Sequence, residues 1–276
     1  MWNRHLHLRS KVLKILVYAL LGMLISLFTL SFHYFVKEKS VSENEQYMAI
    51  YPAKSTYVSY DESIMYWPKV TSILMGKGVN SADPYLLEYE QIATHIPSAS
   101  ESIVALLVEG LNMPVNTSAI LVDLFFISVL FLMLYGFLYY ISGKPLLSML
   151  LALLFIFSFD LILLMTSLPA IGGLINYFEI GNISLLSRTT NMSVSILPLV
   201  AFSFFYYQEF VIENKSKNNT NALFVTSALL VYFNIYMWTF SIVVVFTTYF
   251  AMLLYEEKII LSVLIKKMIR PIFIYI

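Results

Sequence analysis

Apolar residues are gathered along this chain in long stretches, separated by short polar turns and by two longer polar segments. A helix that crosses a bilayer needs roughly 20 apolar residues, and six stretches come close to that length. They are Ile15 to Val36, Ala119 to Ile141, Leu146 to Leu168, Ser193 to Ile212, and two helices within Ala222 to Tyr255 that should break between Asn234 and Trp238. The pattern predicts an all-α, polytopic helical membrane protein with about six transmembrane helices.

The two ends of the chain differ from the spans. The first stretch is too long for the core of a signal peptide and lacks a cleavage site of small residues, so we interpret it as a retained span. Residues 259–276 are apolar but interrupted by Lys266, Lys267 and Arg270, which is typical of an interfacial segment. Pro271 to Ile276 resemble the start of a seventh span, so we expect a truncated chain.

Basic residues predict the orientation. Lys and Arg are enriched in short cytoplasmic loops, and 11 of the 17 basic residues fall on the side that holds residues 1–14. The predicted organisation is a cytoplasmic basic N-terminus (1–14), a first span (15–36), an extracytoplasmic loop (37–118), spans two to six (119–258) and the interfacial tail. Ser167 to Met192 form a second outer segment.

Composition excludes several classes of protein. Only 12% of the residues are charged, against about 25% in soluble domains, and mean hydropathy is +0.76. A soluble enzyme is therefore nearly excluded. The 17 basic and 17 acidic residues cancel, so no basic field indicates nucleic acid. The absence of cysteine excludes disulfides and thiolate metal sites.

One amphipathic helix is predicted at the end of the outer loop. Ser98 and Glu101 have the spacing of a capping box, in which each side chain bonds the other residue's backbone amide. Asn112-Met113-Pro114 would end the helix. Its apolar face would consist of Ile103, Val104, Leu107, Val108 and Leu111. We expect this helix to lie on the outer membrane surface.

A second surface helix is predicted nearer the start of the loop. Apolar residues recur at helical spacing from Ile64 to Leu74. Pro68 must open or kink this helix, and Gly76 and Gly78 would end it.

The outer loop also gathers carboxylates and tyrosines. Asp61 and Glu62 follow Tyr60, and Asp83 opens the turn Asp83-Pro84-Tyr85. A carboxylate near a low-dielectric surface can act as a general base or bind a divalent cation. The alternative is a solvated acidic loop with a turn at Asp83-Pro84.

Three further charged residues lie in or near the spans. Asp123 would lie near the outer end of the second span, where it either snorkels, caps or serves function. Asp160 lies deeper in the third span, where a charge costs roughly 2.5–3.5 kcal/mol, and it should face the bundle. Arg188, in the second outer segment, suits bidentate phosphate binding but could instead pair with Glu179 or lipid headgroups.

Familiar soluble-enzyme motifs are missing from the sequence. There is no GxxxxGK[ST], GxGxxG, HExxH or GxSxG pattern, and the four histidines are too scattered for a metal cluster. ATPase, dinucleotide-binding and zinc-protease functions therefore lack support.

The order of these features resembles the N-terminal module of GT-C superfamily membrane glycosyltransferases, in particular an uncharacterised bacterial branch found with surface-polysaccharide genes. In that branch a pattern like D-x(4)-Y/W…G…DPY…E follows the first span. An F-x-R-x-x-N/P-like element precedes the fourth span, and an aromatic hairpin follows. The matching residues here are Asp61, Tyr66, Trp67, Gly76, Asp83-Pro84-Tyr85, Glu88, Ser187 to Asn191, and Tyr232 to Phe240.

The resemblance implies a multi-pass protein of the bacterial inner membrane that transfers a sugar from a polyprenyl-phosphate donor. Asp61 would be the catalytic base or would position the acceptor, Glu62 or Asp83 would assist it or hold a divalent cation, and Arg188 would bind the donor phosphate. The substrate would also contact Tyr66, Trp67, Tyr85 and Glu88. Members of the family are usually longer and have more spans, so the resemblance covers one module.

Two non-enzymatic functions compete with this one. A transporter or channel would need polar residues along a path through the bilayer, and only Asp123 and Asp160 are candidates. A non-catalytic subunit of a polysaccharide export or assembly system would use the outer loop for docking, and the short chain favours it over a transporter.

Overall fold

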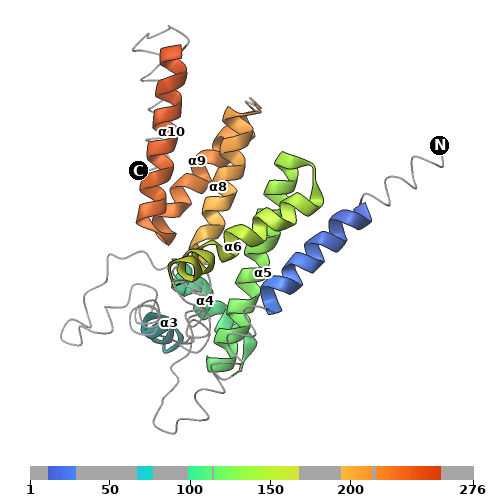
Figure 1. Cartoon of the computed structure of the whole chain (residues 1–276). Helices are drawn as coiled ribbons and strands as arrows, with labels where there is room; N and C mark the ends of the chain where they lie inside the picture. Colours follow the sequence, from blue (N-terminus) through green and yellow to red (C-terminus); the bar gives the residue numbers. More distant parts are fainter. Residues whose placement is uncertain are drawn as a thin grey trace, which may run out of the picture. The chain divides into compact units, whose positions relative to one another are not determined.

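A computed structural model of the chain describes residues 12–28, 67–76, 99–113, 115–167, 194–212 and 216–255 (Figure 1). Within these residues all regular structure is helical, which confirms the predicted all-α class for the described part of the chain. The helices are Val12–Phe28, α3 (Trp67–Leu74), α4 (Ala99–Leu111), α5 (Val115–Ser142), α6 (Pro145–Ser167), α8 (Val194–Phe210), α9 (Lys217–Phe233) and α10 (Ile235–Tyr255).

The chain divides into two compact units. The first comprises residues 1–95 and 100–194 and contains helix Val12–Phe28, α3, α4, α5 and α6. The second comprises residues 96–99 and 195–276 and contains α8, α9 and α10.

Two of the described helices are long and apolar enough to cross a membrane. They are Ile120–Ser142, 23 residues within α5, and Ile235–Met252, 18 residues within α10. Val12–Phe28, Pro145–Phe157 and Val194–Phe210 are apolar but shorter. Two such helices support a membrane protein only weakly, and the number of six spans stays a prediction.

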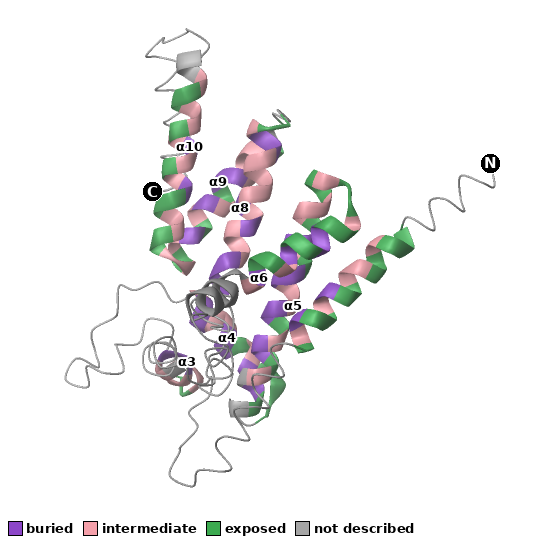
Figure 2. Ribbon diagram, viewed as in Figure 1, coloured by how far each residue is buried: buried purple, intermediate pink, exposed green. Residues whose placement is uncertain are grey.

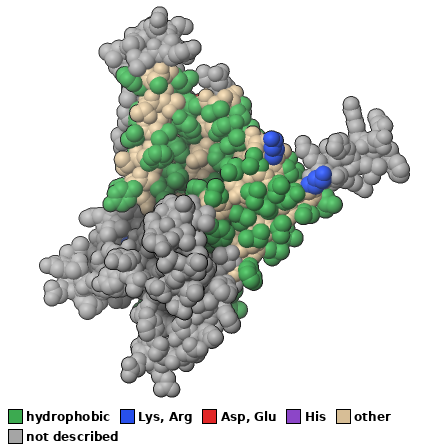
Figure 3. Space-filling view, in the orientation of Figure 1, with side chains coloured by type: hydrophobic (Ala, Val, Ile, Leu, Met, Phe, Trp, Pro, Cys, Tyr) green, Lys and Arg blue, Asp and Glu red, His purple; other side chains and the backbone are tan. Residues whose placement is uncertain are grey.

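Large apolar side chains cover much of the described surface on the face seen in Figure 3. The segment Ile235–Met252 of α10 buries only 11% of its residues within the protein, and exposed positions follow one another along this helix (Figure 2). The other residues in this segment are half-buried or exposed. This exposure is what a bilayer-facing helix would show.

The turn between α5 and α6 lies where the sequence predicts it. Gly143 has a φ of +64°, a left-handed conformation that glycine adopts without steric cost. The backbone amide of Lys144 donates to Ser142 Oγ at 3.2 Å, and the Ser142 and Ser148 hydroxyls lie 2.9 Å apart. Pro145 then begins α6, where its missing amide hydrogen leaves no helical bond unmade.

Helix α3 also matches its prediction. It begins at Trp67, so Pro68 lies in its first turn rather than at a kink. After Leu74 the amide of Gly76 donates to the Ile73 carbonyl at 2.9 Å. Gly76 itself has a φ of +79°, so it ends the helix in the left-handed conformation.

Helix Val12–Phe28 packs closely on the hairpin of α5 and α6. A Cβ atom on Gly22 would overlap the Phe131 ring and lie 2.9 Å from Met149 Cγ. The hydroxyl of Tyr135 donates to the Ile15 carbonyl at 3.0 Å. Small residues allow helices to approach this closely in membranes, so Gly22 sets the distance of this helix from α5.

In the second unit α9 and α10 are separated by a single residue, Asn234. This confirms the predicted break within the long apolar stretch. Asn234 has extended backbone angles, its amide donates to the Leu230 carbonyl, and its Oδ1 accepts from the amides of Tyr236 (3.0 Å) and Met237 (3.3 Å). One side chain therefore ends α9 and caps the start of α10.

The second unit has an apolar core, and hydrogen bonds between side chains connect its helices. The buried core residues are Phe202, Leu223, Phe224, Leu230 and Val245. Side-chain hydrogen bonds join each pair of helices, among them Glu209 with Thr220, Ser227 with Ser241, and Tyr206 with Thr248. Such hydrogen bonds hold helices together where no water competes for them.

Replacing Gly22 with leucine should loosen the first unit. The new side chain has no room beside Phe131, which is fully buried, and overpacking of this kind costs about 1–3 kcal/mol. Thermal unfolding of the purified chain in detergent should show a lower Tm. Gly136→Leu is the matched control, because nothing lies within 4 Å of a Cβ at that position. An equal Tm for the two variants would contradict the close packing.

Replacing Asn234 with alanine should weaken the α9–α10 hairpin. Loss of the cap bonds to Tyr236 and Met237 should cost about 1 kcal/mol of stability. Hydrogen exchange of the amides of residues 235–237 should rise, whereas Asn234→Asp should retain protection because a carboxylate also accepts these bonds. Unchanged exchange in Asn234→Ala would show that the cap contributes nothing.

Candidate functional site

Most residues of the site predicted from sequence lie outside the described residues. These are Asp61, Glu62, Tyr66, Asp83, Tyr85, Glu88 and Arg188. Trp67 begins α3, but its side chain lies outside the described part. The predicted convergence of Asp61 and Arg188 therefore stays a prediction.

The described helices of the first unit bury three charged residues that bear on function. Lys69 of α3 is 6% exposed, Glu101 of α4 is 3% exposed and Asp123 of α5 is fully buried. Burying a charge is costly unless the protein satisfies it. Because they are buried despite this cost, these three residues are the candidate site residues in the part of the chain that the structure describes.

Glu101 lies in the first turn of α4, where the capping-box spacing predicts it. Its side chain is buried, and its Oε2 accepts a hydrogen bond of 2.8 Å from the Ser100 hydroxyl. Ser98, the other member of the predicted box, lies outside the described residues. The sequence reasoning missed Glu101 as a buried acid.

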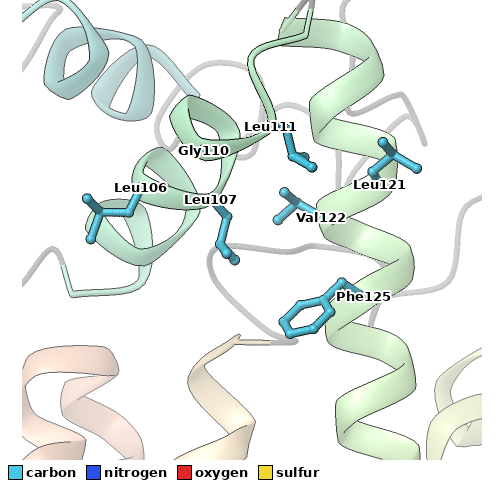
Figure 4. A pocket seen from close by; sticks show the side chains of 7 residues that line it. All are labelled: Leu106, Leu107, Gly110, Leu111, Leu121, Val122 and Phe125. Carbon is cyan, nitrogen blue, oxygen red and sulfur yellow. The ribbon is translucent and has the colours of Figure 1, made fainter.

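The buried face of α4 also differs from the predicted one. It consists of Ser100, Glu101, Val104, Ala105 and Val108. Val104 and Val108 were predicted, but Leu111 is 36% exposed. The face is rotated because the helix turns its two polar residues inward, which moves Leu107 and Leu111 to the side facing α5 (Figure 4).

Asp123 lies deeper in its helix than the sequence indicates. Helix α5 begins at Val115, so Asp123 is about two turns from the helix start and cannot be an end cap. Its complete burial also excludes snorkelling to solvent. Both structural alternatives to a functional Asp123 were therefore wrong. Asp160 lies within α6, but its side chain lies outside the described part.

An apolar groove runs between α4 and α5, next in sequence to Asp123 (Figure 4). Its volume is about 250 Å³. It is lined by Leu106, Leu107, Gly110, Leu111, Leu121, Val122 and Phe125. Such a lining offers no polar group to a ligand, so the groove suits hydrocarbon.

Metal ligands do not gather in the described residues. Among these residues no group of three or more His, Asp or Glu side chains is placed to hold an ion. A divalent cation at Asp61, Glu62 and Asp83 concerns residues outside this part of the chain and stays a prediction.

Comparison with known proteins finds no match. No model of a protein family, no curated protein and no solved structure matches this chain. Function is therefore inferred from the chain's own residues.

Replacing Asp123 with asparagine tests whether this acid is retained for stability. Asparagine keeps the shape and removes the charge. If Asp123 is kept for function, the free energy of unfolding should change little, whereas loss of a buried ionic partner would be strongly destabilising. Unfolding in detergent measures this, with Ser118→Ala, at another fully buried position of α5, as control. A Tm far below that of the control would show that Asp123 has a structural task.

Proposed function

We propose that this chain is a GT-C-like membrane glycosyltransferase that transfers a sugar from a polyprenyl-phosphate-linked donor on the outer face of a bacterial inner membrane. The observation that carries the proposal is the fully buried Asp123 within the membrane-spanning candidate of α5. An ionisable residue inside a membrane is costly and is by default a sign of function.

The proposal includes six spans and a cytoplasmic N-terminus. In this topology α4 lies just before the outer end of the span in α5, so Glu101 and Asp123 belong to the same side of the membrane as the loop 37–118. Basic residues in the short loops support this orientation.

The proposed chemistry is carried by the outer loop. The Asp61 carboxylate takes the proton from an acceptor hydroxyl, whose oxygen forms a bond to the anomeric carbon of the donor sugar. The bond from that carbon to the phosphate oxygen breaks, and polyprenyl phosphate leaves. Arg188 would neutralise the phosphate, and Glu62 or Asp83 would assist Asp61 or hold a cation.

Other residues would position the substrates. Aromatic side chains stack on sugar rings and supply a polar edge as well, which is the proposed task of Tyr66, Trp67 and Tyr85. Glu88 would accept hydrogen bonds from sugar hydroxyls.

The test is sugar transfer by the full chain in proteoliposomes loaded with polyprenyl-phosphate carrying a radiolabelled sugar. Asp61→Asn should lower kcat by about 10²–10⁴-fold, the usual contribution of a general base. Arg188→Lys should raise KM, because lysine cannot make the bidentate phosphate contact. Glu45→Gln, an acidic residue of the same loop outside the pattern, is the control and should retain activity.

Two outcomes decide between this function and its alternative. Equal activity of Asp61→Asn and Glu45→Gln would remove Asp61 from the mechanism. No loss of label from the donor lipid, with a protein that unfolds cooperatively, would favour the non-catalytic subunit or transporter of a polysaccharide export system. Chelation of divalent cations in the same assay tests whether a metal is needed.

A further inference from the structure

The groove between α4 and α5 has features that the proposed chemistry does not use. Three leucines of α4 and three apolar residues of α5 line it, and Leu107 and Leu111 lie opposite Val122 and Phe125 (Figure 4). It contains no charged lining residue, so neither a sugar nor a phosphate finds a partner there. Apolar cavities of this kind stay dry and take up apolar ligands.

Gly110 leaves space on the α4 wall of the groove. Among the described residues, no atom outside the neighbouring backbone of α4 lies within 4 Å of where its Cβ would be. Glycine is a poor helix former, at a cost of about 1 kcal/mol relative to alanine. Its backbone is helical here, so φ does not require glycine.

The groove continues onto a surface that suits lipid. Leu121 and Phe125 line it and are 39% and 52% exposed, and both belong to the membrane-spanning candidate Ile120–Ser142. Leu106 on the opposite wall is 67% exposed. A hydrocarbon chain can therefore pass from a bilayer around α5 into the groove without crossing a polar group.

We propose that this groove binds one acyl chain of a bilayer phospholipid, which fills the space beside Gly110 and joins α4 to α5. The bound acyl chain belongs to a resident phospholipid and not to the sugar donor, because the apolar lining offers no hydrogen-bond partner to a phosphate-linked sugar. The headgroup stays outside the groove. The inference is independent of sugar transfer.

The test uses the full chain in vesicles of phosphatidylethanolamine and phosphatidylglycerol, with a trace of phosphatidylglycerol that carries a diazirine in one acyl chain. After illumination, peptide mass spectrometry should find labelling concentrated on residues 106–125. Gly110→Leu should lower that labelling about tenfold, which corresponds to 1.4 kcal/mol of binding free energy. Gly110→Ala should lower it less, since alanine fills less of the groove.

Gly136→Leu is the matched control. Gly136 is an exposed helical glycine of α5 with open space at its Cβ and lies outside the groove. Its labelling on residues 106–125 should equal that of the unaltered chain. If Gly110→Leu unfolds at the same temperature as Gly136→Leu, the fold is intact and the lost labelling reflects a filled groove. If leucine disturbs the fold, the labelling of Gly110→Ala is compared with that of the unaltered chain instead.

Three outcomes would overturn the proposal. Labelling on residues 106–125 no stronger than on the exposed face of α10 would show general contact with lipid. Unchanged labelling in both Gly110 variants would place the acyl chain elsewhere. Loss of labelling on addition of polyprenyl phosphate, but not of unlabelled phosphatidylglycerol, would assign the groove to an isoprenoid chain. None of these measurements depends on whether sugar is transferred.

Discussion

A polar group in an apolar environment must find its partner within the protein, and most features of this structure follow from that requirement. In a helix the backbone amides and carbonyls are hydrogen-bonded to one another. Hydroxyl side chains find a partner by donating to the carbonyl one turn earlier in the same helix. Such bonds are made by Ser26, Ser128, Ser203, Thr226, Thr239 and Thr247. A hydroxyl that bonds its own helix can face lipid as easily as protein, which is why these residues are compatible with long apolar helices.

The two units use their remaining polar groups differently. In the second unit they join helices, with side-chain hydrogen bonds between each pair among α8, α9 and α10. In the first unit close packing at Gly22 joins helix Val12–Phe28 to the α5–α6 hairpin, and the buried charges lie on α3, α4 and α5. Contacts in the second unit thus join helices, whereas the burial of Asp123 in the first unit is the feature on which the proposed function rests.

The sequence predicted helix ends better than helix environments. Helix ends depend on backbone conformation within one or two residues, as at Asn234, Gly143 and Gly76. Their position can therefore be predicted from the local sequence. The spacing of Glu101 agrees with a helix that begins at Ala99, but it does not indicate burial, because only packing decides whether that face of the helix is solvated. Asp123 lies about one turn inside the span Ile120–Ser142, as predicted. Its burial was not predicted, and α5 begins four residues before the apolar stretch. Which residues of the outer loop come together depends on long-range packing, which the local sequence does not predict.

The single-residue break at Asn234 leaves the two legs of the α9–α10 hairpin unequal. Helix α9 has 17 residues between its caps, a rise of about 26 Å, and α10 has 21 residues, a rise of about 32 Å. Because α9 begins with the polar residues 217–221, its apolar length is only about 18 Å, well below a hydrocarbon core of roughly 30 Å. If both legs cross the bilayer, the hydrophobic mismatch falls entirely on α9. The lipid beside that leg must then thin or the hairpin must tilt, and the hairpin would be accommodated most easily in a thin membrane.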